Sequence, residues 1–238
     1  ALPICPIILE AVGDITTTGF FLGPQGEPIT LGSFSFSEGS DSGNGGAINL
    51  SSASGDIALL GNQQSNRPDN VPSPGPGLRP VTVGSFSLSV QKDSGKSGPI
   101  SIAAGSGSIE VVGNLNTQSF AFQGFDLSVP AGNSGNAGDI TITSNIGDIS
   151  VEGTLNASAG SNAVLSPSGN SGDGGNITLS STSGNIWLLN EDSSILDTST
   201  VSLGGNAFAG NSGNGGIITV SSTTGDILAE GFFVQSDS

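Results

Sequence analysis

The sequence of 238 residues has no histidine, no tyrosine and no methionine, and it has only one cysteine. Nucleophilic and acid–base triads normally need a histidine or another tuned base, so the missing histidines argue against an enzyme. Cys5 has no second cysteine with which to form an internal disulfide. The lack of methionine predicts that the chain is a processed or excised portion of a longer protein.

Basic residues and long apolar runs are also scarce. The 20 acidic residues outnumber four basic ones, which gives a net charge of -16. Nucleic acid and anionic membrane surfaces both require a basic footprint, so neither is expected as a partner. No apolar run approaches the ~20 residues of a membrane-spanning helix, so no membrane span is expected.

The four basic residues fall in one window of the chain. They are Arg67, Arg79, Lys92 and Lys96. The window is either a local binding patch or a solvated loop, and we keep Arg67 and Arg79 as candidate ligand contacts.

An internal repeat organises the rest of the chain. The segment 172–189 predicts two short strands, each opened by glycine, in which apolar residues alternate with small polar ones. Two isoleucines nine residues apart mark this strand pair. The same pair occurs five times, as Ile48 and Ile57, Ile100 and Ile109, Ile140 and Ile149, Ile177 and Ile186, and Ile218 and Ile227.

The segments between the strand pairs vary in length. Residues 62–80 hold five prolines and predict a surface excursion, because proline cannot donate a hydrogen bond to a sheet. Further alternating strands are predicted at 32–37 and 84–89, and in the first of these Phe34 and Phe36 share one face while the serines take the other. No 3.6-residue apolar stripe is present, so no helix longer than a turn is expected.

Repeats that keep their strand spacing while their connectors vary are typical of solenoids. Each repeat exposes an apolar face that only the next repeat can bury, with strands ~4.8 Å apart. Glycines before the strands are expected to allow positive φ at the corners. The sequence therefore predicts an all-β parallel β-helix with irregular loop excursions, as a single domain over residues 1–238 with five to six repeats of ~40 residues. Each repeat forms either one wide coil or two, and the spacing allows both.

The repeat resembles a known family. Gly172–Leu179 reads Gly-Asp-Gly-Gly-Asn-Ile-Thr-Leu, and a Ser-x-x-Gly-Asp/Asn-Ile segment follows it. This pattern is similar to the repeats of filamentous-haemagglutinin-like exoproteins, over nearly all of residues 13–233. Members of that family are large secreted surface proteins of Gram-negative bacteria, usually exported by two-partner secretion. The resemblance implies a right-handed β-helix and an extracellular or cell-surface location.

Acidic residues offer the only candidates for a metal or catalytic site. Asp14, Asp56, Asp148 and Asp226 of the Gly-Asp-Ile segments would stack in a column. One carboxylate per coil supplies too few of the ~6–8 oxygens that Ca²⁺ takes, so side chains that bond their own backbone are the favoured interpretation over a calcium ladder. The carboxylate pairs Glu191–Asp192 and Glu230–Asp237 lack basic neighbours. No metal, cofactor or catalytic residue is predicted.

Two outward-facing features could contact a ligand. The hydroxyl residues of the first strand, such as Thr141 and Thr143, form a column that resembles an ice-binding face, although hydroxyl ladders across strands explain it more simply. Trp187, the only tryptophan, could stack on a sugar ring or be an incidental exposed aromatic.

The sequence thus predicts a non-catalytic extracellular structural protein, a β-solenoid segment of a cell-surface adhesin or filament. Its expected partner is a second copy stacked end to end, or neighbouring repeats of a longer chain. The alternative is a carbohydrate-binding or adhesive module that recognises surface glycans through the 62–80 excursion and the phenylalanine-bearing loops.

Overall fold

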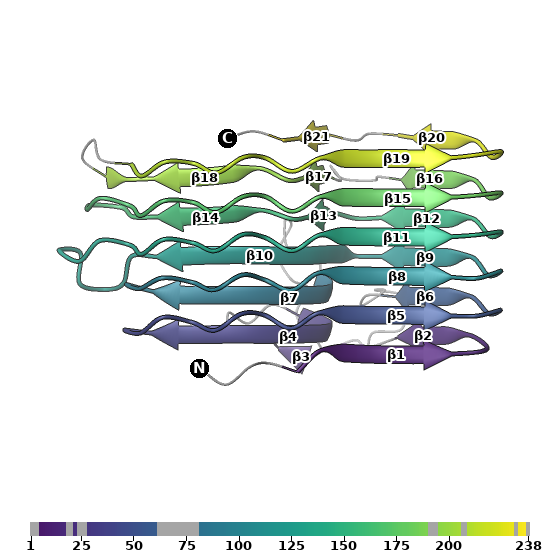
Figure 1. The fold of residues 1–238 in the computed structure, drawn as a ribbon, viewed down its shortest axis with the longest axis horizontal. Coiled ribbons are helices and arrows are strands. Elements are labelled where there is room, and N and C mark those ends of the chain that lie inside the picture. The colour runs from purple at the N-terminus through teal and green to yellow at the C-terminus, as the bar shows by residue number, and fades with distance from the viewer. Residues whose placement is uncertain are drawn as a thin grey trace, which may run out of the picture.

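The computed structural model describes residues 5–17, 21–22, 28–60, 81–189, 195–205, 209–230 and 233–236. Three sheets built almost entirely of parallel strands make up the fold (Figure 1). Sheet A contains β1 (Ile7–Ala11), β5 (Ile48–Ser52), β8 (Ile100–Ala104), β11 (Ile140–Ser144), β15 (Ile177–Ser181) and β19 (Ile218–Ser222). Sheet B contains β2 (Ile15–Thr17), β6 (Ile57–Leu60), β9 (Ile109–Val112), β12 (Ile149–Glu152), β16 (Ile186–Leu189) and β20 (Ile227–Ala229).

Sheet C closes each coil and is the least regular of the three. Its strands are β3 (Phe21–Leu22), β4 (Pro28–Glu38), β7 (Val81–Val90), β10 (Asn114–Phe122), β13 (Leu155–Asn156), β14 (Ala159–Asn162), β17 (Ile195–Asp197), β18 (Thr200–Leu203) and β21 (Phe233–Gln235). Among the described strands, only the β3–β4 pair is antiparallel.

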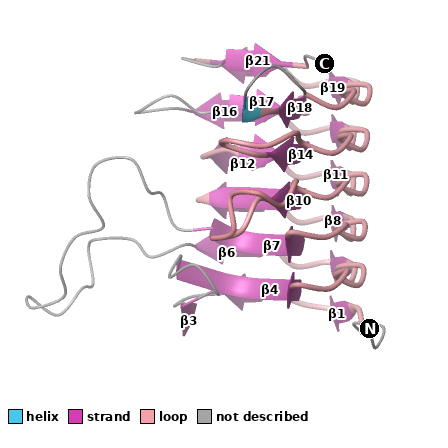
Figure 2. Cartoon of the chain, turned by 90° about the vertical axis from the view of Figure 1, so that its left-hand side faces the viewer, coloured by secondary structure: helices cyan, strands magenta, loops and turns pink. Residues whose placement is uncertain are grey.

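The chain winds as a right-handed parallel β-helix. In Figure 1 it runs from left to right along sheet A on the near side, returns through sheets B and C on the far side, and rises by one layer per circuit. Figure 2, turned by 90°, shows these layers stacked along the axis, with sheet A at one edge and sheet B at the other. The predicted fold class is confirmed.

Each repeat forms one wide coil, so the question of one coil or two is answered. Ile48 pairs with Ile100, and Ile57 pairs with Ile109, the equivalent residues of the next repeat. The same registers continue through every later repeat. The first coil keeps these columns although its strand pair is one residue shorter, because Ile7 and Ile15 take the two isoleucine positions.

The repeat isoleucines form the hydrophobic core between sheets A and B. The eight inner ones are fully buried, and they are Ile48, Ile57, Ile100, Ile109, Ile140, Ile149, Ile177 and Ile186. In the last coil, Ile218 is half-buried and Ile227 is 47% exposed. These two have no coil above them among the described residues.

The interior beside sheet C is apolar where its strands begin, at Val83, Leu115, Leu155 and Leu196, and polar further along them. Ser33, Ser35, Ser85 and Ser87 are buried, whereas Phe36 is 53% exposed on the outer face. The inward serines contact glycine-rich loops that run directly opposite sheet C, at residues 39–47, 91–99, 131–139, 168–176 and 209–217. We call this arrangement the serine–glycine layer.

Ser85 shows how the serine–glycine layer is held together. Its hydroxyl donates to the carbonyl of Gly46 at 2.9 Å and accepts from the N–H of Gly98 at 2.8 Å. Equivalent bonds join Ser119 to Gly95 and Thr200 to Gly213 in later coils. The layer therefore satisfies loop backbone groups that the strands cannot reach.

Most corner glycines are needed for space, not for positive φ as the sequence suggested. A Cβ on Gly147 would lie 2.3 Å from the carbonyl oxygen of Gly107 in the coil below. Among the described glycines only Gly39, Gly113 and Gly153 have positive φ. The predicted 62–80 excursion, with Arg67 and Arg79, lies outside the described residues.

Candidate functional site

Side-chain oxygens link successive coils at the corner between sheets A and B. The N–H of Asp56 donates to Oδ1 of Asp14 at 2.9 Å, and the N–H of Ser108 donates to Oδ1 of Asp56 at 2.7 Å. The series continues upward through Asp148, Asn185 and Asp226. We call this column the corner ladder. Each side chain of the column below Asp226 bonds the backbone of the next coil, so the expectation that these residues bond their own backbone was wrong.

Two similar columns run through the glycine-rich loops. The first loop ladder comprises Asp41, Asp93, Asn133, Asn170 and Asn211. The second loop ladder comprises Asn44, Lys96, Asn136, Asp173 and Asn214. In the second ladder the side-chain bonds are interrupted above Lys96, because a lysine side chain has no acceptor.

The side chains of the ladders have few free oxygens with which to coordinate a metal ion. Each bonded oxygen already accepts a backbone N–H, and successive carboxylates belong to different coils. The part of the chain that the structure describes contains no group of three or more His, Cys, Asp or Glu side chains that could hold a metal. We therefore assign the ladders a structural role.

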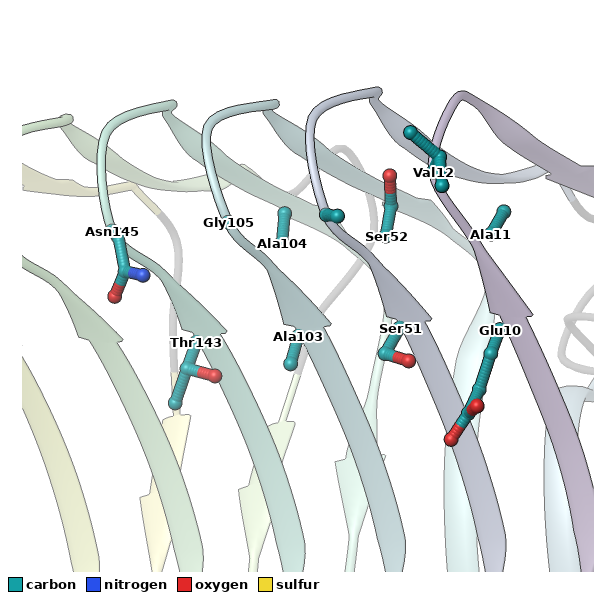
Figure 3. A pocket seen from close by; sticks show the side chains of 11 residues that line it. Glu10, Ala11, Val12, Ser51, Ser52, Ala103, Ala104, Gly105, Thr143 and Asn145 are labelled. Atoms are coloured by element: carbon teal, nitrogen blue, oxygen red, sulfur yellow. The ribbon is translucent and has the colours of Figure 1, made fainter.

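A shallow open groove crosses the first four coils at the ends of the sheet A strands (Figure 3). Its volume is about 620 Å³. Small residues such as Ala103 and Gly105 form its floor, Glu10 and Val12 border it on one side, and Asn145 borders it on the other. The groove exists because two middle coils carry smaller side chains than the coils around them.

The chemistry that the groove could support is limited. Glu10 is its only ionisable side chain, and its remaining polar side chains are Ser51, Ser52, Thr143 and Asn145. Acid–base catalysis on this scaffold would need a second titratable group within hydrogen-bond reach. The groove lining offers none, so the groove is a surface depression lined by a few hydrogen-bonding groups.

Trp187 lies on the outer face of sheet B, as the sequence suggested. It belongs to β16 and is 37% exposed. Its neighbours in register are Ser150 in the coil below and Leu228 in the coil above. Neither neighbour is aromatic, so the structure places no second ring beside Trp187 in its column.

The outward hydroxyls of sheet A do not form the hydroxyl ladder that the sequence suggested. Thr141 pairs with Ser101 and Thr178, and Thr143 pairs with Ala103 and Ser180, in register along the backbone. None of these hydroxyl groups makes a hydrogen bond with another described residue. Their side chains are half-buried on the outer face of sheet A, so the backbone ladder and the buried isoleucines hold these strands together.

A feature that the sequence did not reveal is an ordered loop after β10. The Gln123 amide donates to the carbonyl of Leu127 at 2.8 Å and to the hydroxyl of Ser166 at 2.7 Å, and it accepts from the N–H of Val164 at 2.8 Å. Gln123 thus fastens the corner loops of two successive coils to each other. Phe125, at the tip of the loop, is 99% exposed.

Asp126 supplies a second internal support for this loop. Its Oδ1 accepts from both the hydroxyl and the N–H of Ser128, at 2.6 Å and 3.0 Å. These two bonds hold the pKa of Asp126 below its ordinary value. The Asp-x-Ser spacing was the signal for this turn in the sequence, since Asp side chains often bond the backbone two residues further on.

Comparison of the chain with protein-family models, with curated proteins and with solved structures found no match. Within the described residues, no helix has the length and apolar character needed to cross a membrane.

Proposed function

We propose that this chain is a non-catalytic structural protein, a β-solenoid segment of an extracellular adhesin or surface filament of a Gram-negative bacterium. The observation that carries the proposal is the use of recurring polar side chains. The three ladders and the serine–glycine layer bond the protein's own backbone from coil to coil. The resemblance of the repeats to filamentous-haemagglutinin-like proteins supports the extracellular location.

The two end coils support extension of the solenoid. In the described residues β1 and β2 each pair with a strand on one side only, and so do β19 and β20. An open edge of a sheet is a template for pairing with another strand. Neighbouring repeats of a longer chain or a second copy stacked end to end would supply that strand.

Electron microscopy of the purified chain at increasing concentration tests this proposal. We expect rods that lengthen by end-to-end addition while their width stays constant. Assays for hydrolase and lyase activity on acidic polysaccharides should be blank. Cleavage of such a polysaccharide would contradict the non-catalytic role, and particles whose length does not change with concentration would contradict the stacking of a second copy.

A second candidate function is adhesive recognition of surface glycans by the loop excursions. The two loops that Gln123 joins favour it, because they expose an apolar group, Phe125, Leu127, Val164 and Leu165, and grouped apolar residues often mark interaction sites. Binding to a glycan array should then fall when Phe125 is changed to Ala, while Thr141→Ala on the outer face of sheet A leaves it unchanged. A blank array, or binding that survives both Phe125→Ala and deletion of 62–80, removes this candidate.

A further inference from the structure

Two loops on one side of the solenoid together expose an apolar surface. Phe125 and Leu127 belong to the loop that follows β10, and Val164 belongs to the corresponding loop of the next coil, after β14. Their exposed fractions are 99%, 47% and 71%. We call these three residues the apolar lip. The loop after β10 lies at the left of Figure 1, at the opposite end of the coil from the corner between sheets A and B.

The loops of the apolar lip use polar side chains to bond one another. The Gln123 amide donates to the carbonyl of Leu127, and its oxygen accepts from the N–H of Val164. The Ser128 hydroxyl donates to Oδ1 of Asp126. These bonded groups are not available to the hydroxyls of a sugar, which favours an apolar partner over a glycan.

The apolar lip is held in place before any partner binds. One amide group, that of Gln123, joins the backbone of Leu127 to the backbone of Val164 in the coil above. A binding surface that is already ordered avoids much of the free-energy cost of ordering a loop on binding. Apolar and aromatic residues on such a rigid frame are typical of protein–protein contacts.

The charge beside the apolar lip indicates what else the partner carries. Asp126 is exposed, and the two hydrogen bonds from Ser128 reach its Oδ1, so its Oδ2 accepts from no described donor. Lys92 and Lys96 are the only basic residues that the structure describes, and the net charge of the whole chain is -16. A basic group is therefore attracted to this region, and acidic surfaces and anionic membranes are repelled.

We propose that the apolar lip docks a partner protein that presents a large apolar side chain next to an arginine. The apolar side chain packs on Leu127 and Val164. The guanidinium group stacks on the ring of Phe125 and donates to Oδ2 of Asp126, since arginine serves both contacts. This inference goes beyond the structural role proposed above. It rests on recognition by the loops, the second candidate function, with a protein in place of a glycan.

Selection of random short peptides, displayed on phage, against the full chain tests this proposal. We expect the enriched sequences to carry a large apolar residue within a few positions of an arginine. Sequences rich in Asp or Glu, or the failure to enrich any sequence, would overturn the proposal. An enriched peptide, synthesised with a fluorescent label, is then the probe for variants of the chain, and fluorescence anisotropy measures its affinity.

Phe125→Ala should weaken binding of that peptide about tenfold or more, as truncation of an aromatic anchor typically does. Asp126→Asn should weaken it about two- to fivefold and reduce its salt dependence, because asparagine keeps an oxygen for Ser128 and removes only the charge. The matched controls are Ile146→Ala, at a 60% exposed residue between β11 and β12, and Glu110→Gln, on the exposed face of β9. Both should bind as the unaltered chain does. Unchanged binding to Phe125→Ala would overturn the proposal.

The same measurements separate this inference from the proposed functions. Glycan-array binding that Phe125→Ala abolishes, with no peptide enriched, would overturn the protein partner and support the second candidate function. If the peptide binds as expected while the chain stays monomeric at every concentration, the protein partner is supported and only the stacking of a second copy fails.

Discussion

Single residues in this solenoid are constrained mainly by the coils directly above and below them. Gly147 faces the carbonyl of Gly107, and Asp148 beside it bonds the N–H of Asn185 at 2.6 Å. Position 147 must be glycine because there is no space for a Cβ, and position 148 is constrained by its hydrogen bond to the next coil. Such residues cannot be exchanged freely, although they lie near the surface.

Gly147→Ala should destabilise the protein by roughly 2–4 kcal/mol, because its Cβ would overlap backbone atoms that cannot rotate away. Gly13→Ala, in the same column, should change the stability of the dilute protein by less than ~0.5 kcal/mol. Urea unfolding followed by circular dichroism measures both. Equal effects of the two substitutions would show that close packing of coils does not set the glycine requirement.

The Asp126 turn should respond to acid in a defined direction. Because hydrogen bonds from Ser128 lower the pKa of Asp126 in the folded state, the turn gains stability above the ordinary value of 3.8 and loses it as the pH falls through the lowered value. The Ser128 amide resonance should therefore shift with a midpoint below pH 3.8. In Asp126→Asn that acid-induced shift should be absent; a shift centred above pH 3.8 in the unaltered chain would contradict this.

At the scale of strands, sequence and structure agree for sheets A and B and differ for sheet C. The nine-residue isoleucine spacing predicted the register of sheets A and B, because only one register buries every isoleucine. The alternation in β4 predicted two faces, with Phe34 and Phe36 on one and serines on the other. It could not show which face lies inside, because that depends on how closely a glycine-rich loop approaches from elsewhere in the chain.

The Gln123 contacts were also beyond reach of the sequence. They join loops of two coils whose connector lengths follow no pattern, so no spacing rule links Gln123 to Ser166. The sequence predicted only part of the ladders. The Gly-Asp-Ile repeats predicted a column of aspartates, but the hydrogen-bond partner of each aspartate depends on the direction in which the coils stack.

Ser85 tests the serine–glycine layer. Ser85→Ala should cost roughly 1–3 kcal/mol, because the carbonyl of Gly46 and the N–H of Gly98 lose a buried partner. Ser85→Val should cost more, since a Cβ on Gly45 would already lie 2.8 Å from the Ser85 hydroxyl and the layer has no spare volume. Ser101→Ala, on the outer face of sheet A, is the control and should be nearly neutral. Thermal unfolding ranks the three, and a neutral Ser85→Val would refute close packing in this layer.

At the scale of the whole molecule, the protein is a short stack of wide coils with polar ends. Sheets A and B extend over six coils, and ladders of side-chain-to-backbone hydrogen bonds link successive coils. A molecule of this kind is suited to be one segment of a longer object. A role as one segment of a longer assembly is consistent with the fold, with the lack of histidine and with the structural hydrogen bonds of the acidic residues.

Mass per length of the assembled protein, measured by scanning transmission electron microscopy, tests this account most directly. Six coils spaced ~4.8 Å apart give about 29 Å per chain, so a chain of 23.3 kDa predicts about 0.8 kDa per Å in a single-stranded filament. A value near 0.4 kDa per Å would mean two coils per repeat. Discrete particles that never extend along the coil axis would contradict head-to-tail stacking itself.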